Sequence, residues 1–173
     1  MARMRERIFA GFGAVLFLGS ASALTVFAIS QGSGEKPTTN ASACAQQQTG
    51  ASQSVPQPYT TPDPVTELQT TDLKTGKGPA AKKGDCLVVK YYGTLATTGA
   101  KFDENFTTTT AFGFKLGEGQ VIPGWDQGMV GIKVGGLRRL VIPAALGYGE
   151  QSTSAIPANS DLVFVVKLLQ IKK

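Results

Sequence analysis

The stretch from Gln120 to Gly128, with the sequence QVIPGWDQG, constrains the fold more than any other part of the chain. Pro123 suits the first position of a helix, because a proline there removes no hydrogen bond of the helix. Gly128 and Gly131 then limit this helix to a short length. So short a helix is not stable alone in water, so it must pack on a larger element through Trp125 and its apolar neighbours.

Trp125 is the only tryptophan of the chain, and two roles are open to it. A lone tryptophan in a small domain is most often a packing residue. Alternatively, Trp125 forms the floor of a binding cavity whose walls are other aromatic side chains. The chain also has nine phenylalanines and four tyrosines, so this helix alone does not decide between the two roles.

From residue 65 onward the sequence is typical of a β-rich domain. Residues 86–92 (CLVVKYY) are mostly β-branched and aromatic, and they follow a turn at 83–85. Alternating apolar residues predict three further strands, at 111–116, 137–142 and 162–171. Together with the short helix, these strands predict an α+β domain in which an antiparallel sheet curls around the helix.

The composition excludes several classes of function. The chain has no histidine, which excludes Ser-His-Asp and Cys-His catalysis and any histidine-ligated metal site. A net charge of +5 is too weak to indicate a nucleic-acid partner. The two cysteines match no metal-binding spacing, and no phosphate-binding loop is complete. We therefore expect no metal, no cofactor and no nucleic acid.

The two cysteines lie in different regions of the chain. Cys44 falls in a polar stretch, and we interpret it as an incidental thiol in a linker. Cys86 begins a predicted strand, and we interpret it as a buried, unreactive residue.

The N-terminus contains a candidate membrane segment. Residues 8–29 are free of charge and follow Arg3, Arg5 and Arg7. At about 1.5 Å per residue, this run would span roughly 30 Å of hydrocarbon, with the N-terminus in the cytoplasm. Ala23 ends a small-x-small motif that a signal peptidase could cleave, but the apolar run continues past it and favours an uncleaved anchor. We expect a membrane-anchored, extracytoplasmic protein, or alternatively a secreted one.

The predicted organisation has three parts. Residues 1–29 form a signal anchor or signal peptide. Residues 30–64 are rich in Ser, Thr, Gln, Gly and Pro and have too few apolar side chains to fold, so we expect a flexible linker. Residues 65–173 form the folded domain, which is long enough to bury a core.

A series of short motifs runs through residues 66–173. They are DLxxGxG at 72–78, VVxYxGxL at 88–95, GxxFD at 99–103, FxFxLG at 112–117, VIxGWxxG at 121–128, VGG at 134–136, LxIP at 140–143, GYG at 147–149, IP at 156–157 and LxFxVxLL at 162–169. A single pair would say little, but this order and spacing are specific. The chain resembles the FKBP-type peptidyl-prolyl isomerases over essentially its whole folded part.

This resemblance implies a sheet of five or six antiparallel strands around the Trp125 helix, and a shallow apolar pocket that takes a substrate proline over Trp125. It implies catalytic roles for four residues, Asp103, Tyr148, Trp125 and Phe112. The implied substrate-binding residues are Tyr91, Phe102, Val121, Ile122, Ile156 and Phe164. In the family, the Ile122 N–H and the Tyr148 hydroxyl hold substrate or inhibitor carbonyls, and Asp103 lies at the rim.

The chemistry of proline isomerisation agrees with such a pocket. Rotation about an X–Pro bond breaks amide conjugation against a barrier of roughly 18–20 kcal/mol, and unaided it takes tens of seconds or more. The twisted amide is less polar than either planar isomer, so an apolar, water-poor cavity favours it. This mechanism needs no nucleophile, metal or histidine.

The expected function is therefore an extracytoplasmic, membrane-tethered prolyl isomerase that assists the folding of exported proteins. Its expected partners are proline-containing polypeptides and the macrolide inhibitors of the family, and a monomer is expected. The alternative is a catalytically weak FKBP-like chaperone or binding module. Residues 150–155 are polar and differ from the family pattern, which leaves substrate preference and inhibitor affinity open.

Overall fold

The computed structural model describes Cys44, Gln47–Gln48 and residues 54–172. Its elements, in chain order, are β1 (Gln47–Gln48), β2 (Gln69–Lys74), β3 (Cys86–Leu95), β4 (Lys101–Glu104), β5 (Thr110–Lys115), α1 (Pro123–Gly128), β6 (Leu137–Ile142), the 3-10 helix η2 (Ala144–Leu146) and β7 (Leu162–Lys172). The candidate membrane segment, residues 8–29, lies outside the described residues. Within the described part, no helix is both long and apolar enough to cross a membrane.

All strand pairs in the described part are antiparallel. The strands follow the order β1-β5-β3-β7-β6-β2, and β4 pairs with β3 beside this path. The long strands β3 and β7 pair from Cys86↔Lys172 to Leu95↔Leu162 and form the centre of the sheet. The expected α+β fold, a curled antiparallel sheet with one short helix, is confirmed here for six strands, β2 to β7, to which the two-residue β1 is added.

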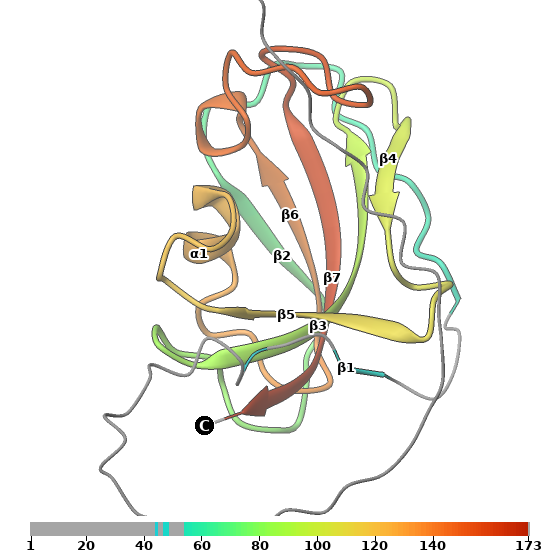
Figure 1. The fold of residues 1–173 in the computed structure, drawn as a ribbon. Helices are drawn as coiled ribbons and strands as arrows, with labels where there is room; N and C mark the ends of the chain where they lie inside the picture. Colours follow the sequence, from blue (N-terminus) through green and yellow to red (C-terminus); the bar gives the residue numbers. More distant parts are fainter. Residues whose placement is uncertain (1–43, 45–46, 49–53, 173) are drawn as a thin grey trace, which may run out of the picture. The chain divides into compact units, whose positions relative to one another are not determined.

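Helix α1 packs on strand β6, as Figure 1 shows. Pro123 is its first residue, and no side chain caps its N-terminus. Gly124 and Gly128 allow the close approach: a Cβ on Gly128 would lie 2.8 Å from Cδ2 of Leu140. The short helix is therefore held by contact with the sheet, as its length requires, and this contact places Trp125 at the centre of the domain.

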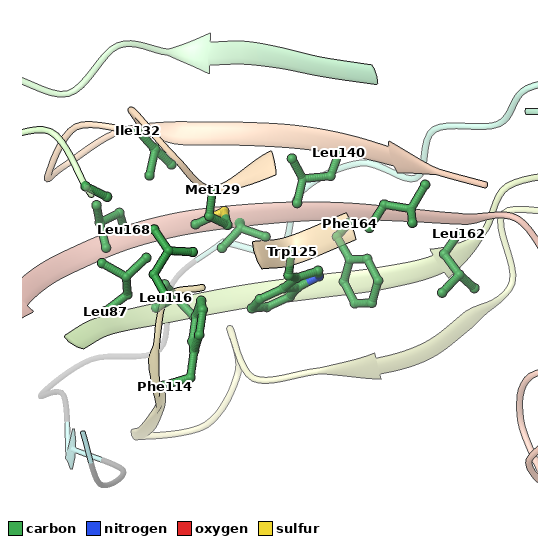
Figure 2. Packing of buried hydrophobic residues seen from close by; sticks show 14 of the residues in the cluster. Leu87, Phe114, Leu116, Trp125, Met129, Ile132, Leu140, Leu162, Phe164 and Leu168 are labelled. Carbon is green, nitrogen blue, oxygen red and sulfur yellow. The ribbon is translucent and has the colours of Figure 1, made fainter. Parts of the chain in front are cut away.

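The main core lies between α1 and the sheet. Leu87, Phe114, Leu116, Trp125, Met129, Ile132, Leu140, Leu162, Phe164 and Leu168 are buried in it, and Figure 2 shows their packing. Trp125 lies between Phe114 and Phe164 (Figure 2), and its exposed fraction is 4%. Strands β3, β5, β6 and β7 all contribute side chains, so these strands and the helix depend on one another.

The interpretation of Cys44 as an incidental thiol is wrong, whereas Cys86 is buried at the start of β3, as expected. Cys44 is bonded to Cys86 in a disulfide, across 42 residues of sequence, and both residues are buried. Close by in the sequence, Gln47 and Gln48 of β1 pair with Ala111 and Thr110 of β5. Cys44 is therefore a structural residue that fastens the segment before the domain to the first residue of β3.

The end of the expected linker also contacts the sheet. The Arg139 guanidinium lies 3.6 Å from the centre of the Tyr59 ring, a cation–π contact. Tyr59 packs against a second buried cluster, which consists of Val65, Ala96, Val141 and Val163. The Thr61 N–H donates a hydrogen bond to the carbonyl oxygen of Ala96 at 2.9 Å. The contacts of the domain thus begin before residue 65.

Arg138, in strand β6, is a buried charged residue. Its Nε and Nη2 donate to the Asp72 carboxylate at 2.6 and 3.1 Å, and its Nη1 donates to the carbonyls of Gly128 and Val130. The hydrogen bond from Arg138 lowers the pKa of Asp72. One buried cation thereby joins β2, β6 and the end of α1.

Candidate functional site

A cavity of about 570 Å³ lies over Trp125. All ten residues that the sequence predicts for the site line it: Tyr91, Phe102, Asp103, Phe112, Val121, Ile122, Trp125, Tyr148, Ile156 and Phe164. Four further residues also line it, namely Gly119, Gln120, Thr153 and Ala155. Strands β3, β4, β5 and β7, helix α1 and the loop before β7 therefore meet at one place.

Trp125 forms the floor of this cavity through edge contacts with its neighbours. Its ring centre lies 5.2 Å from that of Phe164, 5.5 Å from that of Tyr91 and 6.2 Å from that of Phe112, with the rings close to perpendicular in each pair. Such edge-to-face arrangements stabilise aromatic clusters beyond simple burial. The indole N–H is buried and has no hydrogen-bond partner among the described residues, so the floor is the carbon surface of the ring with one unpaired polar atom.

The close packing of two wall residues depends on Gly93 in strand β3. A Cβ at this position would lie 2.7 Å from Phe102 and 2.8 Å from Phe164, which is too close for any other residue without movement. The two rings are themselves 5.4 Å apart, at 80° to one another. Gly93 thus allows Phe102, from β4, and Phe164, from β7, to meet above the central strand.

The rim carries one polar pair. The Tyr91 hydroxyl donates a hydrogen bond to Oδ2 of Asp103 at 2.6 Å, and Oδ1 of Asp103 accepts from the Glu104 N–H at 2.8 Å. Burial, and then this hydrogen bond, raise the pKa of Tyr91 far above its usual value. Tyr91 therefore stays protonated at neutral pH, and Asp103 is fixed in orientation.

Two further residues that line the cavity carry hydrogen-bond donors. Tyr148 lies in the loop after η2, and 38% of its surface is exposed. Ile122 precedes α1, and its N–H donates no hydrogen bond within the described ranges, while its carbonyl accepts from Trp125 and Asp126. Both groups are available to a carbonyl of a bound molecule.

The polar loop at 150–155 has internal order. Oγ1 of Thr153 accepts hydrogen bonds from the N–H groups of Ala155 and Ile156, and the Thr153 N–H donates to the Ile156 carbonyl at 2.8 Å. These bonds hold Ile156, which is 5% exposed, against the cavity. The loop therefore brings a small methyl group, from Ala155, to a position that borders the site.

Sequence reasoning missed Lys90, which precedes the cavity residue Tyr91 in β3. The Lys90 side chain is fully buried, and its ammonium donates to the carbonyls of Asn105, Thr108 and Thr110. Burial lowers the pKa of Lys90, and Glu104 partly opposes this effect. The available signal was a single charge between Val89 and Tyr91, inside a strand that is otherwise apolar.

The geometry suits a small apolar ring with a carbonyl beside it. The aromatic floor and walls exclude water from the ring, and the Tyr148 hydroxyl and the Ile122 N–H can each donate a hydrogen bond to the carbonyl. Within the described part, no group of three or more Cys, Asp or Glu residues could hold a metal ion.

Comparison with known proteins identifies relatives of this domain. Residues 78–169 match the family model described as FKBP-type peptidyl-prolyl cis-trans isomerase. FK506-binding protein 4 of Saccharomyces cerevisiae is 54% identical over 101 residues, which are 58% of this chain and 25% of that protein. FK506-binding protein 4 of Aspergillus fumigatus is 50% identical over 108 residues, which are 62% of this chain and 22% of that protein. The chain thus spans about a quarter of the length of these curated relatives.

Solved structures show the same similarity. The crystal structure of FkpA from Escherichia coli superposes with a TM-score of 0.56 at 45% identity, over 62% of this chain and 49% of that one. The crystal structure of AtFKBP13 gives a TM-score of 0.56 at 32% identity, over 61% of this chain and 93% of that one.

Proposed function

Since this chain belongs to the FKBP-type peptidyl-prolyl cis-trans isomerase family, we propose that its aromatic cavity catalyses the cis-trans isomerisation of X–Pro peptide bonds. The observation that carries the proposal is the meeting of ten predicted residues around one cavity with Trp125 at its floor. The substrates are proline-containing polypeptides. The test is the isomerisation rate of a Leu-Pro peptide with the purified full-length chain.

Each part of the cavity has a role in this proposal. The proline ring lies over Trp125, between Phe112 and Phe164, where water is excluded. As the X–Pro bond twists, its amide loses conjugation and becomes less polar, so the dry wall stabilises the twisted state relative to the planar isomers. Asp103 lies at the rim, near the rotating carbonyl. The hydrogen bond from the Tyr91 hydroxyl fixes the orientation of its carboxylate.

Two hydrogen-bond donors of the cavity hold the substrate polypeptide on either side of its proline. The Ile122 N–H and the Tyr148 hydroxyl bind substrate carbonyls, so that rotation takes place about one bond. The relatives are named for FK506 binding, and we propose that macrolides of that kind occupy the same cavity. We also propose that the domain acts as a monomer.

Tyr148→Phe is expected to lower kcat/KM by about tenfold at most, with the fold unchanged. The substitution removes one hydrogen bond at a partly open site, worth roughly 0.5–1.5 kcal/mol, and 1.36 kcal/mol corresponds to tenfold. The measurement is kcat/KM on Leu-Pro and Phe-Pro peptides. Tyr92→Phe is the matched control, since Tyr92 lies in β3 but does not line the cavity, and equal losses in both variants would contradict the role of Tyr148.

A wild-type chain without isomerase activity would favour the alternative, a binding module. In that case the domain would still bind proline-containing peptides through the cavity. Binding is measured by the fluorescence of Trp125, which is the only tryptophan of the chain.

We propose that the domain works outside the cytoplasm, anchored by residues 8–29, and assists the folding of exported proteins. The apolar run with its arginine flank supports this placement. The Cys44–Cys86 disulfide supports it independently, because disulfides form and persist in oxidising compartments.

The chain is expected to fractionate with membranes and to be cleaved by protease added from the outer side. Its N-terminal arginines should stay protected, because the positive flank remains in the cytoplasm. Mass spectrometry of the isolated protein identifies its first residue. A soluble exported form that begins at Leu24 would show that the segment is a cleaved signal peptide, and the secreted alternative would then hold.

A further inference from the structure

Strand β3 changes its partner on one side at Lys90 and Tyr91. Its first part pairs with β5, from Cys86↔Lys115 to Val89↔Phe112, and its last part pairs with β4, from Tyr92↔Glu104 to Thr94↔Lys101. Lys90 and Tyr91 lie between these two partners. The chain that joins β4 to β5, residues 105–109, passes this gap.

The side chain of Asn105 takes the place of a strand in the gap. Its Oδ1 accepts from the Tyr91 N–H at 2.6 Å, and its Nδ2 donates to the Val89 carbonyl at 3.4 Å. The Asn105 N–H donates to the Tyr91 carbonyl at 3.0 Å. Asn105, the first residue of this loop, therefore provides hydrogen-bond partners for the Tyr91 N–H, the Tyr91 carbonyl and the Val89 carbonyl, and Tyr91 has no strand partner on this side.

The ammonium group of Lys90 holds the rest of the loop. It donates at 2.8 Å to the carbonyl of Asn105, at 2.7 Å to that of Thr108 and at 3.0 Å to that of Thr110. An ammonium has three N–H donors, and all three are used. The Lys90 side chain is 0% exposed, and a buried cation is stable only when its donors are satisfied. The lysine therefore needs the carbonyls of the loop as acceptors, and these carbonyls need the lysine as their donor.

Both ends of this loop carry residues of the cavity. Asp103 precedes Asn105 by two residues, and Phe112 follows Thr110 by two. Both contact Tyr91, the neighbour of Lys90 in β3: Asp103 accepts its hydroxyl at 2.6 Å, and the ring of Phe112 lies 6.0 Å from its ring. The Lys90 side chain thus anchors the loop whose two ends meet Tyr91 at the wall of the site.

We propose that Lys90 is a positioning residue for proline isomerisation, acting through the loop 105–110 on Asp103 and Phe112. The proposal rests on the function proposed above. Without the ammonium, three carbonyls lose their donor and the loop must rearrange around water, which displaces both ends relative to Tyr91. A displacement of about 1 Å at a reacting site can lower a rate by about 100-fold.

The test uses Lys90→Met in the full-length chain, because methionine keeps an unbranched side chain without the charge or the donors. We expect kcat for a Leu-Pro peptide to fall by about 10- to 100-fold, while KM changes little and circular dichroism stays native. The emission of Trp125 should shift to the red, since Tyr91 and Phe112 both contact its ring. Lys133→Met, at an exposed lysine outside the cavity, is the matched control and should match wild type.

A double variant separates positioning from mere stability. If Lys90 acts through Asp103, the loss caused by Lys90→Met should be smaller in an Asp103→Asn background than in wild type. A folded Lys90→Met chain with wild-type kcat, or fully additive losses in the double variant, would overturn the proposal. If Lys90→Met does not fold, Lys90→Arg is tested in the same assays, because arginine keeps the charge but shifts the positions of the donors. A reduced kcat in this variant supports the proposal, and a wild-type kcat overturns it.

Failure of the proposed function gives a different result. A wild-type chain that does not isomerise peptides would refute the enzyme assignment and with it a role of Lys90 in the reaction. Amide hydrogen exchange at residues 105–110 and the Trp125 spectrum would still show, in Lys90→Met, whether the lysine holds the wall.

Discussion

Replacement of both Cys44 and Cys86 by alanine is expected to lower the free energy of unfolding by about 4 kcal/mol. The disulfide closes a loop of 42 residues, and the loop-entropy relation gives about this value for a loop of that length. The measurement is urea denaturation monitored by the fluorescence of Trp125. Reduction of the wild-type chain should cause a similar loss, and the same reducing agent should leave the double variant unchanged.

Removal of residues 1–64 should destabilise the domain further than loss of the disulfide alone. The truncation also removes Tyr59, which stacks on Arg139, and Thr61, which donates to Ala96. A chain that begins at residue 65 and unfolds at the same urea concentration as the full-length chain would contradict both the structural role of Cys44 and these contacts.

Loss of the disulfide should leave isomerisation nearly unchanged in the folded chain. Cys86 is the first residue of β3 and pairs with Lys172 and Lys115, whereas the cavity is built on the later residues of the strand, Tyr91 and Gly93. The measurement is kcat/KM of the variant without the disulfide, at a low temperature where it is fully folded. A clear loss of kcat/KM under these conditions would contradict this expectation and show that the two ends of β3 are coupled.

The sheet could be predicted because it depends on local patterns, and the residues that line the cavity could be predicted from the family resemblance. Alternating apolar residues marked β5, β6 and β7, and Pro123 with Gly128 marked the bounds of α1. The ten cavity residues follow from motifs whose order is that of the family, so their positions could be transferred one by one. Once the chain adopts the fold of the family, these ten residues line one cavity.

The missed features all depend on partners that are distant in the sequence. The polar composition around Cys44 indicates a linker, and only the folded chain brings it to Cys86. Lys90 and Arg138 look like exposed strand residues, yet each is buried because backbone carbonyls from a separate segment accept its donors. Tyr59 is a single aromatic residue in a proline-rich stretch, and its contact with Arg139 leaves no periodic signal.

Phe114→Ala is expected to act mainly on stability, and Phe112→Ala mainly on activity. The two rings are stacked in β5, with their centres 5.7 Å apart. Phe114 is buried, with 1% of its surface exposed, and it does not line the cavity. Its truncation should lower the free energy of unfolding by about 3–5 kcal/mol, because it leaves a void behind Trp125 that the core cannot fill.

Phe112 is half-buried and lines the cavity, so its truncation widens the site and leaves no closed void. Phe112→Ala should therefore cost less stability than Phe114→Ala, but it should lower kcat/KM by about tenfold or more, equivalent to at least 1.36 kcal/mol of transition-state stabilisation, because water reaches the twisted amide. The measurement is kcat/KM at low temperature, corrected for the folded fraction from urea denaturation, with Phe112→Leu as the control that restores most of the apolar wall. If Phe114→Ala lowered the corrected kcat/KM as much as Phe112→Ala, the cavity wall would not be the source of catalysis, and the rate would depend on the packing of the whole core.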